Sequence, residues 1–257
     1  MKKRFSLSCL LLLLVASLLF TSCGRADRLT YDKEAEGYVR RGDGVVYQKA
    51  PTAYRAVRIN KDRVLATIKS DDLETPLYAV CNADGSTCMD SSVWMADEDY
   101  NVYYVKGTKL PTLSELAPTE VQIVQVSTIS YSVGEIKDAS QISTMLYCYQ
   151  SGAAFSYTDS SCTFRLNDPK RNDLYFSSDE NGLYYVLLLY RYEDDVYLTD
   201  DVEDPASFTP KYNRPYQLEE YNGKTYVKYN LGKNFMYDRT TRMCYPVDGL
   251  LDSYFAS

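Results

Sequence analysis

GLYYVLLLYRY, residues 182–192, is the stretch that says most about the fold, because it is apolar on both faces for most of its length. A strand with one solvated face would alternate apolar and polar residues, so this pattern predicts a central strand covered on both sides. Asn181 and Gly182 form a dipeptide typical of tight hairpin turns. We therefore expect "DLYFSS" (173–178) to pair with this strand.

A second hairpin is expected on the C-terminal side of this strand. "YQLEEY" (216–221) and "KTYVKYNL" (224–231) flank Asn222-Gly223, again a strong two-residue turn signal. "VDGLLDSYF" (247–255) predicts a short terminal helix. On the N-terminal side, "EVQIVQVSTISY" (120–131) is typical of a further strand.

One helix is predicted from "DASQISTMLYCYQSG" (138–152). Asp138 is a suitable N-cap, and Gly152 is well placed to end the helix. Apolar side chains recur at the i, i+3, i+4, i+7 spacing of one helix face. They are Ile142, Met145, Leu146 and Tyr149. This stripe predicts packing against a core rather than a binding face.

The N-terminal half indicates short strands. "YRAVRI" (54–59) and "RVLATIKS" (63–70) alternate around a polar turn at 60–62 and predict a hairpin. "LYAVCNADGSTCMD" (77–90) predicts another, centred on Asp84-Gly85. Pro111 and Pro118 in the segment 107–120 indicate a boundary.

The fold class expected is therefore α+β and β-rich, with antiparallel sheets and one amphipathic helix at about 139–151. The boundary divides the chain into a β-rich lobe at 38–110 and an α+β lobe at 119–257. The length also accommodates one large domain instead of two modest ones.

Cysteine positions suggest one or two disulfides. Cys81 and Cys88 lie symmetrically about Asp84-Gly85, and directly opposed strand residues are close enough for a bridge. The sequence leaves open whether they are bridged or remain two half-buried thiols. Cys148 and Cys162 form a weaker candidate pair, and the default expectation for Cys148 and Cys244 is an inert, buried thiol.

The N-terminus reads as an export signal, with a basic start at Lys2 to Arg4 and a Leu-rich run at 10–20. Its end, Phe20-Thr21-Ser22-Cys23, resembles the lipobox of bacterial lipoproteins, although Phe20 stands where Leu is usual. The resemblance covers residues 1–23 only. It implies removal of the signal peptide 1–22, acylation of Cys23 and a lipid-anchored protein facing outside the cytoplasm. The charged segment 23–37 is expected to be a solvated tether.

Composition narrows the possible partners. The 257-residue chain carries a formal charge of −7, and loss of residues 1–22 makes it −10. Such a chain is a poor partner for nucleic acid or for an anionic membrane surface. Tyr occurs 26 times, against 8 times for Phe and once for Trp. Tyrosine rings serve either as strand filler or as a stacking surface for a ligand.

No catalytic residue, metal ligand or cofactor is assigned from the sequence. The chain has no His, which excludes Ser-His-Asp chemistry and His-ligated zinc. The acidic run 192–205 is expected to be a solvated turn, with Ca²⁺ binding as the alternative, because the spacing of its carboxylates matches no known calcium loop.

These features lead us to expect a non-catalytic binding or interaction module at the cell envelope. Its expected partners are the membrane, through the lipid anchor, and a cell-wall or extracellular polysaccharide or an envelope protein. The alternative is a carboxylate-dependent enzyme acting on saccharides, which needs two facing acidic side chains in a cleft.

Overall fold

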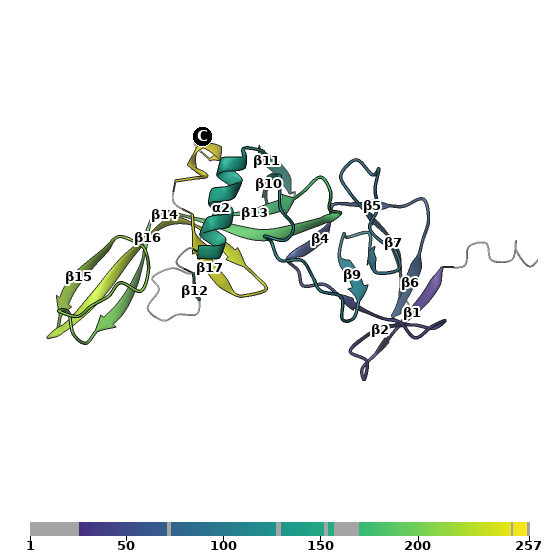
Figure 1. Ribbon diagram of the computed structural model, residues 1–257, viewed down its shortest axis with the longest axis horizontal. Helices are drawn as coiled ribbons and strands as arrows, with labels where there is room; N and C mark the ends of the chain where they lie inside the picture. The colour runs from purple at the N-terminus through teal and green to yellow at the C-terminus, as the bar shows by residue number, and fades with distance from the viewer. Residues whose placement is uncertain are drawn as a thin grey trace, which may run out of the picture.

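The computed structural model describes residues 26–70, 73–126, 130–151, 154–156, 170–247 and 249–255. These residues form a β-rich chain with one α-helix, α2 (Ala139–Ser151), and a short 3-10 helix, η1 (Asp252–Tyr254). The molecule is elongated, with the N-terminal strands at one end and a long hairpin at the other (Figure 1).

The strands belong to two sheets. In chain order they are β1 (Asp27–Asp32), β2 (Gly37–Arg40), β3 (Val46–Lys49), β4 (Tyr54–Ala56), β5 (Arg58–Asn60), β6 (Ala66–Ser70), β7 (Leu73–Cys81), β8 (Trp94–Ala96), β9 (Val102–Val105), β10 (Glu120–Gln125), β11 (Tyr131–Ile136), β12 (Phe155–Ser156), β13 (Lys170–Ser177), β14 (Leu183–Val202), β15 (Tyr216–Tyr221), β16 (Lys224–Asp238) and β17 (Met243–Pro246).

The first sheet closes into a seven-stranded barrel. Its order is β7-β6-β1-β2-β3-β9-β8, with β8 pairing back onto β7 and with β5 added to β7 outside the ring. Every pair is antiparallel except β1 with β6, which is parallel. The barrel core consists of Leu29, Tyr47, Ala66, Ile68, Leu77, Met95 and Tyr103. Because the ring is closed, each of these seven strands has a paired neighbour on both sides.

The second sheet has the order β11-β10-β13-β14-β16-β17-β12, with β15 added to β16 and β4 added to β14. The predicted central strand is β14, and the hairpin with β13 is confirmed by pairs such as Phe176 with Tyr185. The hairpin of β15 with β16 is confirmed as well, since Tyr221 opposes Lys224 across the Asn222-Gly223 turn. Both turn residues have positive φ, 52° and 73°. This hairpin type requires such a backbone.

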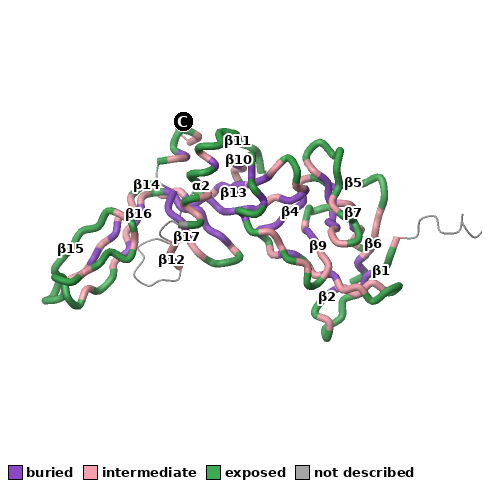
Figure 2. The backbone as a smooth tube through the Cα atoms, in the orientation of Figure 1, coloured by how far each residue is buried: buried purple, intermediate pink, exposed green. Residues whose placement is uncertain are grey.

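β14 and β16 run on beyond the body of the sheet. Their pairing shifts register between Arg191 and Val196, beside Gly232, whose φ is +81°. Beyond this irregularity the two strands and β15 form a three-stranded finger, which we define as residues 192–231 (Figure 1). A second buried cluster runs from the body of the sheet, with Tyr190 and Phe235, into the finger, with Val227 and Tyr229, and exposed residues surround it there (Figure 2).

Helix α2 occupies the predicted residues and packs on the second sheet. Asp138 caps it as expected, since its Oδ1 accepts a hydrogen bond from the backbone N–H of Gln141 at 2.9 Å. Met145 is fully buried, and Ile142 is 3 % exposed. The helix therefore presents the predicted apolar stripe to the core.

One core connects the barrel with the second sheet. Tyr78, Val80 and Ala96, on barrel strands, belong to the same buried cluster as Leu187 and Met145. Strand β4, within the predicted N-terminal lobe, pairs with β14 of the second sheet. Gly182 marks the closest approach, because an added Cβ there would lie 2.9 Å from the Val80 side chain.

Three local predictions are wrong. β5 pairs with β7 instead of β6, because β7 is long enough to pair with both. The segment from Asp27 to Gly37, expected to be tether, supplies β1 and the start of β2. The acidic run, expected to be a turn, continues β14 as far as Val202. Polar residues are tolerated in such strands because their side chains face solvent while the backbone groups pair.

Candidate functional site

A tyrosine-lined hollow of about 370 Å³ lies where the barrel meets the second sheet. It is bounded by β4, by the turn between β8 and β9, and by β13 and β14. Its lining consists of Arg55, Ala56, Val57, Asp99, Tyr100, Tyr175 and Tyr184. The volume is at the lower end of the range for small-molecule sites, which suits a ligand of the size of one or two rings.

Strand pairing places three of these side chains on one face. Arg55 of β4 lies directly opposite Tyr184 of β14, and Tyr175 of β13 opposes Val186, two residues further along β14. Residues two apart on a strand point the same way. The rings of Tyr175 and Tyr184 pack edge to face, with centroids 5.2 Å apart.

The turn opposite is built around Asp97, which is 5 % exposed. Its Oδ1 accepts hydrogen bonds from the backbone N–H groups of Asp99 at 3.0 Å and Asn101 at 2.9 Å. Between them, Tyr100 adopts a φ of +61°, in the left-handed region that is costly for a side chain of this size. The backbone oxygen of Tyr100 also accepts a bond from the N–H of Ala56, 3.0 Å away. The turn is therefore fixed to the rim of the hollow.

Tyr100 is 43 % exposed on this rigid turn. Left-handed backbone at a non-glycine residue costs of the order of 1 kcal/mol or more and persists only where its surroundings determine it. Here the surroundings are the buried carboxylate of Asp97 and the pairing with β4. An exposed ring held in this way requires little further ordering when a ligand binds.

Polar groups flank the rings. Arg55 donates through Nη1 to the side-chain oxygen of Asn101 and, at 3.4 Å, to the backbone oxygen of Asp99. Its other N–H groups have no protein partner among the described residues. The hydroxyl of Tyr184 donates to Gln122 Oε1 at 3.5 Å, a long bond that a closer acceptor can replace.

The hydroxyls of Tyr175 and Tyr184 stay protonated near neutral pH. Burial raises the pKa of Tyr184, and the charge of Glu120 adds to the effect. Burial likewise raises the pKa of Tyr175. The charge of Asp173 raises this pKa further, and the charge of Arg55 partly offsets the increase. The hollow thus offers neutral hydroxyls, a guanidinium and aromatic surface, a set suited to a polar ring compound with apolar faces.

Sequence reasoning did not single out this hollow. Its residues come from four segments that are up to 129 positions apart, and only pairing of β4 with β14 brings them together. The nearest signals in the sequence are the high tyrosine content and the "ADEDYN" turn (96–101), in which Asp97 and Asn101 flank Tyr100. Neither signal indicates a shared location.

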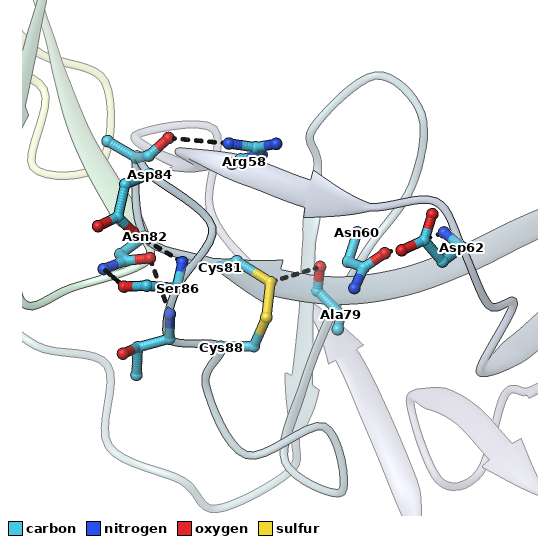
Figure 3. Close-up of a disulfide and its surroundings, with 11 residues drawn as sticks. Arg58, Asn60, Asp62, Ala79, Cys81, Asn82, Asp84, Ser86 and Cys88 are labelled. Carbon is cyan, nitrogen blue, oxygen red and sulfur yellow. Dashed lines mark hydrogen bonds between the residues drawn. A yellow bond between two sulfur atoms is a disulfide. The ribbon is translucent and has the colours of Figure 1, made fainter.

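The structure joins Cys81 and Cys88 in a disulfide across the Asp84-Gly85 turn (Figure 3). Cys81 is buried and Cys88 exposed, at opposite positions of an antiparallel bridge. Cys148 is a half-buried free thiol whose pKa is raised by burial. Cys244 is fully buried. The expected lipid attachment at Cys23 and the partner expected for Cys148, Cys162, lie outside the described residues.

The acidic run does not reach the tyrosine-lined hollow. It lies on the distal part of β14, in the finger. No cluster of three or more metal-binding side chains occurs within the described ranges, so the structure gives the calcium alternative no support there. One residue of the run, Asp195, lines a separate hollow of about 340 Å³ that Asp252 also lines.

These two carboxylates both act as hydrogen-bond acceptors. Asn230 donates to Asp195 at 2.9 Å, and Asn234 donates to Asp252 at 2.8 Å. Lys233 lines the same hollow. This hollow is a candidate place for a carboxylate-dependent reaction, because two acidic side chains line it.

Exposed tyrosines are dispersed over the molecule instead of forming one flat row. Tyr31 lies on the barrel, Tyr131 on β11, Tyr147 on α2, and Tyr216 and Tyr221 on β15. In the part of the chain that the structure describes, no helix is long and apolar enough to cross a membrane. Comparison with known proteins finds no matching family model, no similar curated protein and no similar solved structure.

Proposed function

We propose that the protein is a lipoprotein anchored to a membrane through Cys23 and facing outside the cytoplasm, and that it acts as a non-catalytic module that binds saccharide. The observation that carries the binding part is the hollow at the junction of the barrel and second sheet, where Arg55 and Asp99 accompany three tyrosines. The anchor is supported by the lipobox-like sequence at 20–23.

The chemistry of the hollow matches a sugar ring. Sugars present C–H faces that pack on aromatic rings and hydroxyls that exchange hydrogen bonds with guanidinium and carboxylate groups. Tyr100 supplies exposed aromatic surface on a fixed turn. A polysaccharide of the cell wall or of the cell exterior contains many such rings, and repeated weak contacts give useful retention.

The test is binding of the full mature chain to a panel of purified cell-wall and extracellular polysaccharides, followed by calorimetry with fragments of any that retain it. Tyr100→Ala is expected to weaken binding about tenfold, the equivalent of about 1.4 kcal/mol. Tyr147→Ala is the matched control, because Tyr147 is a tyrosine 60 % exposed on α2, outside the hollow. Equal affinities of the two variants, or retention by no polysaccharide, would overturn the proposal.

The alternative that we keep is a carboxylate-dependent saccharide hydrolase, and its candidate site is the second hollow. Asp195 and Asp252 both line this hollow, so turnover there would depend on both. Release of reducing ends by the wild-type protein, lost in Asp195→Asn and in Asp252→Asn, would favour the enzyme. Hydrolysis that survives both changes would exclude this hollow as its site.

A further inference from the structure

The outer strand of the finger, β15, has one edge that no other described strand pairs with. Its residues Tyr216 to Tyr221 pair with β16 on one side only, and all six are exposed. The pairing starts with the N–H of Asn230 donating to the oxygen of Pro215 and continues without a register shift. In antiparallel pairs every second residue turns its backbone groups away from the neighbouring strand. For β15 these residues are Tyr216, Leu218 and Glu220.

β15 has only part of the usual protection of an edge strand, the charges of Glu219 and Glu220. Natural edges carry lysine, proline or a bulge that prevents pairing with other chains. Here the six residues "YQLEEY" include no lysine and no proline, and the pairing has no bulge. Three of the nine large hydrophobic side chains that are exposed among the described residues lie on this short strand: Tyr216, Leu218 and Tyr221.

The edge is preformed. The finger has a core in which Val227 and Tyr229 of β16 are buried, and Phe208 and Tyr212 of the connecting segment pack against it. Tyr216 contacts Phe208 edge to face, with ring centroids 5.3 Å apart. The N–H of Lys211 donates to the hydroxyl of Tyr229 at 2.8 Å, and this bond holds the connecting segment against β16. A fixed edge loses little conformational entropy when a strand is added.

Charge indicates which partner the edge accepts. Residues 192–231 carry nine acidic and four basic side chains, a net charge of −5. On β15 itself Glu219 and Glu220 are acidic, and only Glu219 has a cation beside it, Lys228 at 3.3 Å. A second copy of this strand would add two more glutamates to an acidic finger and does not complement its charge. A basic strand would add charge of the opposite sign.

We propose that β15 is a docking edge for a partner protein, which adds an extended segment of alternating apolar and basic residues as a fourth strand of the finger. Backbone hydrogen bonds to Tyr216, Leu218 and Glu220 supply affinity, as in other cases of strand addition. Apolar side chains of the partner contact Tyr216 and Leu218 on one face of the finger, and its cations lie on the other face, beside Glu219. This site is separate from the saccharide site, so either proposal stands without the other.

The first test uses a fluorescein-labelled ten-residue peptide of alternating valine and lysine, with fluorescence anisotropy on the full mature chain. The controls are a peptide with glutamate in place of lysine, and a lysine peptide N-methylated on every residue so that neither strand edge has N–H groups. The lysine peptide should bind at least tenfold more tightly than either. Equal binding of the N-methylated peptide would show attraction by charge alone and overturn the proposal.

The second test uses variants of one position. Leu218→Pro removes an N–H that faces away from β16, so it blocks strand addition without breaking the existing pairing. Leu218→Thr keeps that N–H and is the matched control. We expect at least a tenfold loss of peptide binding for the proline variant and less than threefold for the threonine variant. Equal affinities of the two variants, both folded by circular dichroism, would contradict an added strand.

Hydrogen exchange of the wild-type protein locates the contact independently of any variant. Addition of the lysine peptide should slow exchange of the amides of Tyr216, Leu218 and Glu220, while those of Gln217 and Glu219, already bonded to β16, change little. Protection elsewhere, with these three amides unchanged, would place the peptide on another surface and refute the assignment.

Discussion

At the scale of single residues, the feature most important for stability is the buried carboxylate of Asp238. It is fully buried, and its Oδ2 accepts hydrogen bonds from the hydroxyls of Tyr149 and Tyr185, each at 2.8 Å. Oδ1 accepts a third from the backbone N–H of Thr240 at 2.7 Å. The helix α2, the central strand β14 and the end of β16 therefore meet at one acceptor.

Removal of this acceptor should destabilise the protein strongly. Asp238→Ala removes the acceptor of two buried hydroxyls and one N–H and leaves the hydroxyls only their 3.2 Å contact with each other, so we expect the free energy of unfolding to fall by about 3 kcal/mol. Asp62→Ala, at an exposed position, should change it by less than about 0.5 kcal/mol. Urea unfolding followed by circular dichroism measures both. A loss below about 1 kcal/mol in Asp238→Ala would show that the network contributes less than a typical set of buried hydrogen bonds.

Buried tyrosines also predict the response to alkaline pH. Burial and the nearby charge of Asp238 raise the pKa of Tyr54 to about 12, against about 10 in an unfolded chain. The pKa values of Tyr149 and Tyr185 are raised as well, first of all by burial. The folded state therefore holds these protons more tightly than the unfolded state, and the contribution of these tyrosines to stability should be constant below about pH 10 and fall above it.

Tyr54→Phe isolates one of these groups. The variant loses the hydrogen bond from the Tyr54 hydroxyl to the oxygen of Pro111 and should be about 1 kcal/mol less stable at pH 7. Between pH 10 and 12 the free energy of unfolding should fall less steeply for the variant than for the wild type. The two slopes should differ by about 1.4 kcal/mol per pH unit. Unfolding curves at pH 7, 9, 10 and 11 measure this difference. Parallel slopes for both proteins would contradict it.

At the scale of elements, the disulfide stabilises the turn between β7 and the bridge residue Cys88. Cross-linking two residues that are so close in the chain removes conformational freedom from the unfolded state, worth about 2 kcal/mol for a short loop. Cys81→Ser/Cys88→Ser should therefore lower the free energy of unfolding by about 2 kcal/mol. Reductant should have the same effect on the wild type and none on the double variant. Cys148→Ser is the control, because Cys148 forms no disulfide.

The elements that sequence reasoning predicted correctly are those set by local signals. Helix α2 follows from the Asp138 cap and the spacing of its apolar residues, and two hairpins follow from Asn-Gly turns. Barrel closure was not predicted, because it depends on pairing of β1 with β6 and of β7 with β8, which no turn specifies. The tyrosine-lined hollow was missed for the same reason, since it requires β4 to leave the barrel and join β14.

At the scale of the whole molecule, the barrel and the finger occupy opposite ends (Figure 1). The N-terminal strand begins at Asp27, four residues after the proposed anchor Cys23. Four residues span at most about 14 Å, so an acylated Cys23 would hold the barrel next to the membrane surface. The finger, at the far end, would then be the part presented to other molecules.

This arrangement predicts a gradient of distance from the membrane. Gly42 lines the same hollow as Ala26, close to the anchor, and has open space around it, whereas Lys224 lies at the finger tip. A fluorophore on Gly42→Cys, in a Cys148→Ser background, should be quenched strongly by spin-labelled lipid headgroups in vesicles that carry the acylated protein. A fluorophore on Lys224→Cys should be quenched little. Such quenching requires the fluorophore to lie close to the lipid headgroups, and a four-residue spacer brings only the barrel end of the molecule that close.

Two results would contradict the proposed anchor and orientation. Retention of Cys23→Ala in the membrane fraction would show that acylation is not what holds the protein there. Equal quenching at both positions would show that the molecule lies along the surface, which would make the β15 edge less accessible to a soluble partner. Insertion of a flexible Gly-Ser spacer of about twelve residues between Cys23 and Asp27 should reduce quenching at position 42 without releasing the protein, because the barrel is then free to leave the surface while the lipid stays inserted.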